Sequence, residues 1–435
     1  MLSSEVRLRG RLGGQLAACR RMLLDLRYAG SMPARDRWNA YPPVKTLGTV
    51  LAEVSNLDYK FALMRSIPER GRGVISRYRD FLPVNDKTPI VSLGEGDTPL
   101  IYCPRLSERI GRGCDVFVKN EGVNPTGSFK DRGMTVAVSK AIERGARTLI
   151  CASTGNTSAS AAAYAARAGI SCVVILPGGK IATGKLLQAF AYGAKIVAID
   201  GNFDDALRIV RELGERSDFS IVNSINPDRI AGQKTAAFEI VDEIGDAPDF
   251  HLLPVGNAGN ITAYWAGYGE YQARQRTFPE PQSNASTKVP AMIGFQAAGA
   301  APIFYNQIIQ KPQTIASAIR IGNPASWKQA RAAITESHGA IDIVSDKEII
   351  AAQTWLARYE GIFVEPASAA AIAGVFKCCD SNEAAYSFKK IPEQSRIVCT
   401  VTGHGLKDPD IIMQRMRELK PVPATVKDVQ RAIDL

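Results

Sequence analysis

The sequence has 435 residues, of which 46% are hydrophobic and 22% charged, a composition typical of soluble globular proteins and long enough for two or three lobes. The formal net charge is +10, but residues 1–65 hold eleven Lys or Arg against five Asp or Glu, so most of the excess lies at the N-terminus. Because no basic run is interleaved with aromatic residues, a nucleic-acid partner is not expected, and no apolar stretch is long enough to predict a membrane span.

Residues 1–64 differ from the rest of the chain. They are arginine-rich and lack the apolar core of a secretory signal. Three interpretations are open: a disordered extension, an organellar transit peptide, or a start codon upstream of the true start at Met64. Glu5 and Asp25 weaken the transit-peptide interpretation. We therefore expect a cytoplasmic protein, and an organellar stroma only if this segment is a transit peptide.

Strands and helices alternate regularly from about Thr88. Strands are predicted as short apolar runs, as expected when helices cover both faces of a sheet, at Asp115–Lys119, Thr148–Ser153, Cys172–Pro177, Lys195–Asp200, Ser220–Asn223, His251–Val255, Met292–Gln296 and Arg396–Thr400. Helices are predicted from near Ser128 and at Asn156–Ala168, Gly184–Tyr192, Phe203–Glu215, Gly232–Ile244, Asn260–Arg274 and Asp346–Glu360, with a strand-to-helix segment at Phe363–Phe376. This alternation predicts an α/β fold of parallel βαβ units. The polar segment Thr277–Lys288 is predicted to be a surface loop or insert.

The loop after the first predicted strand carries a candidate nucleophile. It reads NPTGSFKDRG over residues 124–133, and Ser128 is a suitable N-cap, which would place Lys130 in the first turn of the following helix. The positive end of the helix dipole disfavours an ammonium group there and should lower the pKa of Lys130. A free amine is the nucleophile of Schiff-base chemistry, although most lysines at such positions are only solvated side chains.

Two further loops join a strand to a helix. Residues 153–158 (STGNTS) offer hydroxyls, an amide and backbone N–H groups suited to a carboxylate or phosphate, although helix capping alone would explain them. Residues 256–260 (GNAGN) contain two glycines that let the backbone fold round an anion, but glycine-rich turns are common. In open α/β sheets ligands bind at the edge where such loops lie, so the three loops predict one site.

No metal site is predicted. The three histidines, His251, His338 and His404, are far apart and form no HExxH pattern. The eight cysteines show no zinc-ribbon spacing, and the adjacent pair Cys378–Cys379 is not a redox CxxC motif. Most of the cysteines are therefore expected to be buried, reduced thiols.

The three loops in this order (SFKDRG, STGNTSAS and GNAGN) resemble those of fold type II pyridoxal-phosphate enzymes, from about residue 65 to the C-terminus. Within that group the chain is similar to threonine synthases in LGEGDTPL (93–100), KNEGVNPTGSFKDRGM (119–134), NSINPDRIAGQKTAAFEI (223–240), PVGNAGNITAYW (254–265), FVEPASAA (363–370) and VTGHGLKDPD (401–410). The resemblance implies a tryptophan synthase β-like fold of two open, twisted, mostly parallel sheets flanked by helices. It also implies a smaller lobe at about 131–215, a larger lobe formed by 65–130 and 216–435, and a homodimer.

The resemblance also implies a cofactor, pyridoxal 5'-phosphate, and a catalytic residue, Lys130, that binds the cofactor aldehyde. Asn156 would lie at the cofactor's phenolic oxygen and Thr402 at its pyridine nitrogen, and its phosphate would be held by Gly256, Asn257, Ala258, Gly259 and Asn260. The implied reaction converts O-phospho-L-homoserine and water to L-threonine and phosphate. The side chains implied to hold the substrate's carboxylate or phosphate are Ser153, Thr154, Asn223, Ser224 and Arg229.

Two residues and two rival functions stay open. Arg229 is suited to a phosphate by its two-pronged guanidinium, but could instead form a surface salt bridge. His404 stands where the family more often has a smaller or amide residue, and it is expected at the rim of the pocket. A serine/threonine dehydratase would share the lysine and asparagine loops but needs no receptor for a substrate phosphate. An inactive cofactor-binding homologue is opposed by the presence of every residue that the chemistry requires.

Overall fold

The computed structural model describes residues 73–178, 183–201, 203–224, 226–277, 285–380, 391–415, 418 and 421–433. They belong to one compact unit, Pro68–Leu435. The predictions for residues 1–64 lie outside the described residues, as does most of the predicted insert, whose residues 278–284 are not described. Within the described part of the chain, no helix is long and apolar enough to cross a membrane.

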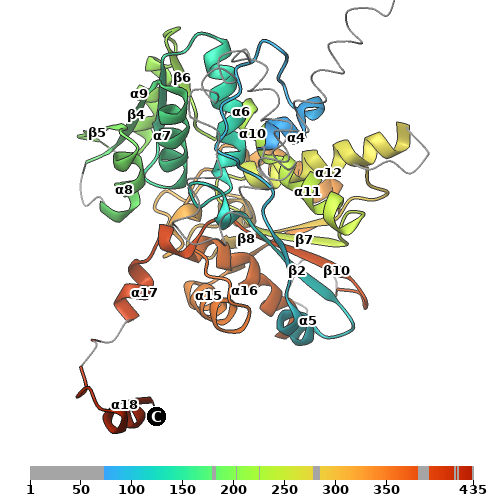
Figure 1. Ribbon diagram of the computed structural model, residues 1–435. Helices are drawn as coiled ribbons and strands as arrows, with labels where there is room; N and C mark the ends of the chain where they lie inside the picture. The colour runs from blue at the N-terminus through green and yellow to red at the C-terminus, as the bar shows by residue number, and fades with distance from the viewer. Residues whose placement is uncertain are drawn as a thin grey trace, which may run out of the picture. The chain divides into compact units, whose positions relative to one another are not determined.

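The described strands form two sheets (Figure 1). The larger has the order β1-β2-β10-β7-β8-β9 and the smaller the order β5-β4-β3-β6. Among the described strands only β1 runs antiparallel to its neighbour, so the prediction of two mostly parallel sheets is confirmed. The strands are β1 (Leu100–Tyr102), β2 (Asp115–Asn120), β3 (Thr148–Ala152), β4 (Ser171–Pro177), β5 (Lys195–Ile199), β6 (Phe219–Ile221), β7 (Phe250–Pro254), β8 (Ala291–Ala297), β9 (Ala340–Val344) and β10 (Arg396–Val401).

Helices cover both faces of each sheet, and the strands bury successive side chains on opposite faces. In β3, Leu149 packs in the core formed with α6 and α7, whereas Ile150 packs against α9. In β7, Leu252 lies in the core formed with α15 and α16, and Leu253 in the core formed with α11 and α12. The helices are α4 (Val74–Arg77), α5 (Pro104–Ile110), α6 (Lys130–Glu143), α7 (Asn156–Ala168), α8 (Thr183–Ala191), α9 (Phe203–Leu213), α10 (Pro227–Gln233), α11 (Thr235–Ile244), α12 (Gly259–Thr277), α13 (Pro302–Tyr305), α14 (Trp327–Glu336), α15 (Asp346–Tyr359), α16 (Pro366–Asp380), α17 (Asp410–Arg415) and α18 (Val426–Ile433).

Two predicted elements differ from the structure. The single helix predicted at Gly232–Ile244 is two helices, because α10 already starts at Pro227 and ends before Lys234. The Asn226 side chain caps α10 by accepting from the backbone N–H of Asp228, and a proline at the first helical position suits that start. The segment Phe363–Phe376 contains helix α16 but no strand, since Val364 makes only an isolated bridge to His404. The described α-helices and strands that were not predicted have at most ten residues each: α4, β1, α5, α13, α14, β9, α17 and α18.

The small sheet extends beyond the segment expected for the smaller lobe. Its edge strand β6 pairs with β3 in parallel, which brings Phe219–Ile221 into this sheet. The division into lobes at 131–215 and at 65–130 plus 216–435 stays a prediction. Strand β6 belongs to the small sheet although its residues come after position 215.

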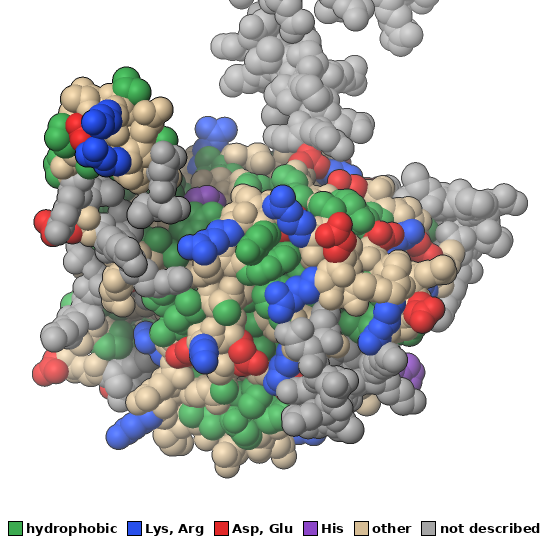
Figure 2. Space-filling view, turned by 90° about the horizontal axis from the view of Figure 1, so that it is seen from below, with side chains coloured by type: hydrophobic (Ala, Val, Ile, Leu, Met, Phe, Trp, Pro, Cys, Tyr) green, Lys and Arg blue, Asp and Glu red, His purple; other side chains and the backbone are tan. Residues whose placement is uncertain are grey.

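Charged side chains are distributed differently at the surface and in the interior. On the face seen in Figure 2, Lys and Arg side chains are interspersed with Asp and Glu and do not gather into one basic patch. In the interior, the wholly buried Arg132 of α6 joins three elements. It donates to both carboxylate oxygens of Glu121, at 2.6 and 2.8 Å, and to those of Glu239 in α11, at 2.7 and 2.5 Å. Lys119 of β2 donates to Glu239 at 2.8 Å.

This buried network contains two cations and two carboxylates, so its charges balance. Burial alone would raise the pKa of the Glu239 carboxyl, but the charges of Arg132 and Lys119 outweigh burial and hold that pKa well below its usual value. The network ties the first turn of α6 to the end of β2 and to α11. The helix that carries Lys130 is therefore anchored to the large sheet through Arg132.

We predict that Arg132→Leu lowers the free energy of unfolding by about 3–5 kcal/mol, because Glu121 and Glu239 would be left buried without their partner. Urea denaturation of the purified variants measures this loss. As a control, Arg208→Leu removes an exposed arginine paired with Glu212 and should change stability by less than about 0.5 kcal/mol. Similar losses in the two variants would contradict the structural role of Arg132.

Candidate active site

The predicted site loops meet at the carboxyl ends of the strands. Within each sheet these ends lie on one edge, because β2, β7 and β10 run parallel in the large sheet and β3 and β6 run parallel in the small one. The loop before α6 is joined to the loop after β10 by a hydrogen bond from the backbone N–H of Phe129 to the carbonyl oxygen of Thr402, at 3.0 Å. The structure thus brings the predicted loops into one region.

Helix α6 begins at Lys130, as the sequence predicts, but Ser128 is not its N-cap. Phe129 occupies the cap position, and the buried hydroxyl of Ser128 has no hydrogen-bond partner among the described residues. The loop is closed instead by Asp131, whose carboxylate accepts from the backbone N–H and hydroxyl of Thr126, both at 2.7 Å, and from the hydroxyl of Ser160 at 2.6 Å. Asp131 therefore fixes the loop that precedes the helix, whereas the helix itself has no side-chain cap.

The pKa of Lys130 is lowered to about 7. Burial is the main cause, the positive charge of Arg229 adds to it, and the carboxylate of Glu365 opposes both. The direction of this pKa shift agrees with the prediction. Its causes are burial and a neighbouring cation rather than the helix dipole. The free-amine form of Lys130 is therefore populated at neutral pH. In the described part of the chain no hydrogen bond occupies Nζ, which lies 4.1 Å from the centre of the Phe129 ring.

Residues 256–260 form a cradle for an anion. Helix α12 starts within this segment, at Gly259, and Ala258 adopts a left-handed φ of 64°, which is unusual for a residue with a side chain. The side-chain amide nitrogen of Asn260 (Nδ2) is buried and has no partner among the described residues. At Gly256 a Cβ atom would come within 3.0 Å of the Ile319 backbone. An orphaned N–H donor at the start of a long helix fits a phosphate group.

A buried carboxylate that the sequence analysis did not single out connects two predicted site residues. The Asn156 amide nitrogen donates to Oε1 and Oε2 of Glu365, at 3.1 and 3.0 Å, and the Thr402 hydroxyl donates to Oε1 at 3.4 Å. Ser368, also missed, lies 2.9 Å from the Thr402 hydroxyl and accepts from the backbone N–H groups of Thr402 and Gly403. The signal available in the sequence was an acidic residue between an apolar pair and a helix-starting proline, in FVEPASAA.

Arg229 is wholly buried, so the alternative of a surface salt bridge is wrong. One of its terminal nitrogens donates to the Val222 carbonyl oxygen at 3.0 Å, whereas Nε and the other terminal nitrogen have no partner among the described residues. Burial lowers the pKa of this guanidinium to about 10. A buried cation with two unpartnered nitrogens and no carboxylate partner in the described chain is suited to bind an anion.

The remaining predicted substrate residues flank the carboxyl ends of the small sheet. The Asn223 amide exchanges two hydrogen bonds with the backbone of Ala152, at 3.2 and 3.1 Å, which leaves one of its N–H groups for a ligand. The Ser153 hydroxyl accepts from the backbone N–H of Gly155 at 3.3 Å. Thr154 is exposed and Ser224 is half-buried. Asn223 therefore holds the two strand ends together, and Ser153 and Thr154 remain accessible in their loop.

The loop after β10 closes one side of the region. The backbone N–H of His404 donates to the Gly127 carbonyl oxygen at 2.9 Å, and its ring packs edge-on to Phe363. Lys407, which the sequence analysis missed, donates to the carbonyl oxygen of Thr126 at 3.1 Å and contacts the side chain of Gln188 in α8. His404 and Lys407 thus both lie against the loop that carries Lys130.

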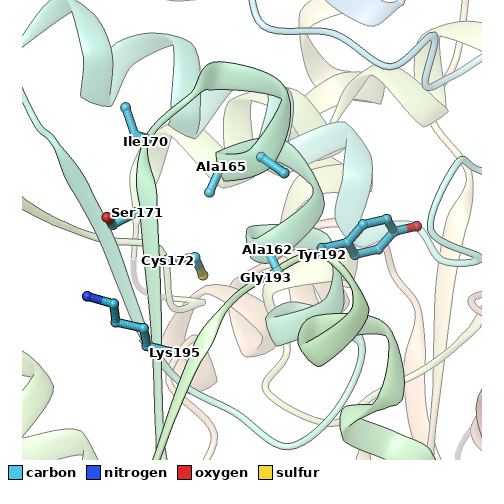
Figure 3. A pocket seen from close by; sticks show the side chains of 9 residues that line it. Ala162, Ala165, Ile170, Ser171, Cys172, Tyr192, Gly193 and Lys195 are labelled. Carbon is cyan, nitrogen blue, oxygen red and sulfur yellow. The ribbon is translucent and has the colours of Figure 1, made fainter.

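A separate pocket of about 170 Å³ lies in the small sheet, between the end of α7 and the starts of β4 and β5 (Figure 3). Its lining includes Ala165, Cys172, Tyr192 and Lys195. This is the amino end of the strands, opposite the edge where ligands bind in open α/β sheets, and none of the predicted site residues lines it. Among the described residues, no group of three or more His, Cys, Asp and Glu could hold a metal ion.

Comparisons with known proteins agree with this geometry. The family model "Pyridoxal-phosphate dependent enzyme" matches residues 91–403. Threonine synthase of Mycobacterium tuberculosis is 56% identical over 354 residues, which cover 81% of this chain and 93% of the relative. Threonine synthase of Synechocystis sp. is 55% identical over 345 residues (79% and 86%), and that of Methanocaldococcus jannaschii is 50% identical over 351 residues (79% and 82%).

Solved structures of lower identity share the fold. Maize serine racemase superposes with a TM-score of 0.59 at 21% identity, covering 73% of this chain and 91% of the racemase. O-ureido-L-serine synthase superposes with a TM-score of 0.61 at 19% identity, covering 80% of this chain and all of that one. A lysine with a lowered pKa and an unpartnered donor at the start of α12 also fit the cofactor for which the matching family model is named. The chain thus belongs to the pyridoxal-phosphate dependent enzymes and, within them, to the threonine synthase family.

Proposed function

We propose that this enzyme converts O-phospho-L-homoserine and water to L-threonine and phosphate, with Lys130 as its catalytic residue. The observation that carries the assignment of residues is a wholly buried cation close to a lysine whose pKa is lowered. Arg229 is close enough to Lys130 for its charge to lower the pKa of the lysine, and two of its nitrogens, Nε and one terminal nitrogen, have no partner among the described residues. A cofactor aldehyde at Lys130 and a substrate phosphate at Arg229 would satisfy both.

Lys130 moves the protons of the reaction. When bound, pyridoxal phosphate supplies the electron sink that stabilises negative charge on the substrate carbons. The Lys130 amine takes the α-proton, passes it on and then takes a β-proton, and phosphate leaves from the γ-carbon. A proton then adds at the γ-carbon, the hydroxyl of water adds at the β-carbon, and a proton returns to the α-carbon. A pKa near 7 suits a group that must both accept and return protons at neutral pH.

Arg229 holds the substrate phosphate and neutralises it as it leaves. A guanidinium offers two parallel N–H groups to phosphate oxygens, and in a buried site such a contact is stronger than in water. Ser153, Thr154, Asn223 and Ser224 surround this position with hydroxyl and amide donors and hold the carboxylate or the phosphate.

The cofactor is held by three groups of residues. Its phosphate lies in the cradle of Gly256, Asn257, Ala258, Gly259 and Asn260, where the start of α12 and the orphaned Asn260 amide supply donors. Asn156 faces the phenolic oxygen. Thr402 faces the pyridine nitrogen, a position at which its hydroxyl is also shared with Ser368.

A serine/threonine dehydratase is the alternative from the same class, and Arg229 disfavours it. Burying a cation without a partner costs stability, and a dehydratase substrate has no second anion to offset that cost. An inactive homologue is disfavoured by the lowered pKa of Lys130, which has no structural use. A homodimer and a cytoplasmic location follow from the family resemblance, and analytical ultracentrifugation of the full chain measures the first.

The proposed reaction predicts that phosphate and threonine appear in equal amounts from O-phospho-L-homoserine. Both products are measured in one tube, colorimetrically for phosphate and by chromatography for threonine. Turnover of L-serine or L-threonine at a comparable kcat/KM, with no phosphate released from phosphohomoserine, would identify a dehydratase instead.

Lys130→Ala should abolish turnover while the cofactor-free protein becomes more stable at neutral or lower pH. Below pH 7 the folded wild type carries a buried ammonium group at a cost. Between pH 7 and the usual lysine pKa the unfolded chain binds more protons than the folded one, so this cost shrinks as pH rises. Urea denaturation of cofactor-free wild type and variant should show a larger gain at pH 6 than at pH 9. A pH-independent difference would contradict the lowered pKa.

Arg229→Ala should reduce kcat/KM for O-phospho-L-homoserine by roughly 30- to 1000-fold, because a charge-assisted contact to the leaving phosphate is lost. The affinity for pyridoxal phosphate should be unchanged, because in this proposal residues 256–260 hold its phosphate. Arg229→Lys should restore only part of the rate, since a point charge cannot reproduce the two-pronged contact.

The matched control for this variant is Arg144→Ala. Arg144 is an exposed arginine that pairs with Asp228, the residue next to Arg229 in α10. It should keep nearly full activity. Equal kcat/KM for Arg229→Ala and wild type would remove Arg229 from the site.

A further inference from the structure

Glu365 is a buried carboxylate that directly precedes helix α16, and only 3% of the residue is exposed. Its backbone N–H donates to the Gly403 carbonyl oxygen at 3.0 Å. Its carboxylate lies so close to Gly403 that a Cβ atom there would come within 2.6 Å of Oε1. The loop after β10 therefore contacts Glu365 at two places, its backbone N–H and its carboxylate, and so fixes the position of the carboxylate.

The two side chains that contact this carboxylate are those proposed to face the cofactor ring. Asn156 donates to both oxygens through one amide nitrogen, at 3.1 and 3.0 Å. Thr402 makes a longer contact, 3.4 Å, through its hydroxyl. Asn156 comes from the small sheet and Thr402 from the large one, so Glu365 links the two sheets at the position of the ring.

The carboxylate decides which end of the Asn156 amide faces it. An amide has an NH2 end that donates and an oxygen end that accepts, whereas an ionised carboxylate only accepts. Contact of one nitrogen with both carboxylate oxygens at nearly equal distances is the geometry of an ionised group, and it engages one of the two N–H bonds. The second N–H of Asn156 stays available in the site. If the amide were reversed, its oxygen would occupy this position instead.

The charged groups around Glu365 come from two elements. Burial raises the pKa of its carboxyl and Asp408 adds to that effect, whereas the Asn156 amide and the charges of Lys407 and Lys130 oppose it. The effect between Glu365 and Lys130 is mutual, since the carboxylate also favours a positive charge on the Lys130 nitrogen. Glu365 thus acts both on the Asn156 amide and on the charge at Lys130.

We propose that Glu365 is a positioning residue for the cofactor ring: it turns the NH2 end of Asn156 into the site, so that an N–H group faces the phenolic oxygen. The inference rests on the proposed role of Asn156. A donor at this oxygen stabilises its ionised form, and the nearby carboxylate stabilises a proton on the Lys130 nitrogen that is bonded to the cofactor. Both effects favour the charged form of the linkage, which absorbs visible light, over the neutral form, which absorbs in the near ultraviolet.

The test compares Glu365→Gln with wild type in the absence of substrate. A glutamine keeps the size of the side chain but can present either end to Asn156 and carries no charge. We expect the ratio of visible to near-ultraviolet absorbance at pH 7 to fall about tenfold, the size of one charge-assisted hydrogen bond. The affinity of the cofactor-free protein for pyridoxal phosphate, measured by titration, should fall by a similar factor.

The control variant is Glu360→Gln, and it should match wild type in both measurements. Glu360 is a half-buried carboxylate that accepts from the backbone N–H of Leu106 at 2.8 Å, near α5 and not in the site. Thermal melting of each cofactor-free protein shows whether it is folded.

A second variant, Glu365→Asp, separates the contact from the charge and gives a result even if the glutamine variant fails to fold. It keeps the charge but withdraws the carboxylate by about 1.5 Å, the length of one bond, which breaks contacts at 3.0 Å. A positioning role predicts that it loses the visible band as the glutamine variant does. A wild-type spectrum for Glu365→Asp would overturn the proposal, as would a spectrum of Glu365→Gln equal to that of Glu360→Gln.

Coupling to Asn156 is the last measurement. If Glu365 acts through this amide, adding Glu365→Gln to Asn156→Ala should change the absorbance ratio less than it does in wild type. Full additivity would contradict the inference. Failure of the proposed function would be seen separately, as a wild-type protein that binds the cofactor but forms no threonine from O-phospho-L-homoserine.

Discussion

The position of Lys130 depends on buried charges in the two residues that follow it. Asp131 closes the preceding loop through Thr126 and reaches Ser160 in α7, and Arg132 binds Glu121 and Glu239 below the start of the helix. A lysine side chain has four rotatable bonds, so its amine can be placed only if its backbone does not move. Charged contacts between buried groups supply that rigidity, and their balance of two cations and two carboxylates beneath α6 lets them remain ionised away from water.

The same region also holds two basic side chains whose charge the fold disfavours. Lys130 has its pKa lowered by burial and by Arg229, more than Glu365 offsets, and Arg229 itself is buried with two unpartnered nitrogens among the described residues. Neither arrangement stabilises the folded chain by itself. Both become favourable only when an electrophile or an anion is present, which is a pattern found at sites that bind charged substrates. The balanced network around Arg132 and the pair of Lys130 and Arg229 therefore have opposite purposes, although Arg132 and Lys130 are only two positions apart in α6.

How far the sequence predicts this structure differs between its parts. Apolar runs such as those of β4 and β7 predict the strands within one or two residues, since both faces of each strand are buried and the pattern is continuous. The start of α10 was missed because the run NPDR was taken as loop, although Asn226 and Pro227 together form a helix start. At the site, the family motif indicates Lys130 and Arg229. It does not indicate Glu365, because a contact with Asn156 across 209 positions of the chain leaves no local pattern.

The fold by itself does not determine which reaction the enzyme catalyses. Serine racemase and O-ureido-L-serine synthase share it at about 20% identity, and that level of likeness extends to the sheets and helices alone. What distinguishes this chain must lie in side chains placed on the common frame. Helix α10 is the clearest such place, since it packs on α6 so closely that Gly232 and Gly133 could not carry a side chain without displacing backbone. That close approach buries Arg229 near Lys130, so the proposed selectivity for a substrate phosphate would be set by how two helices pack.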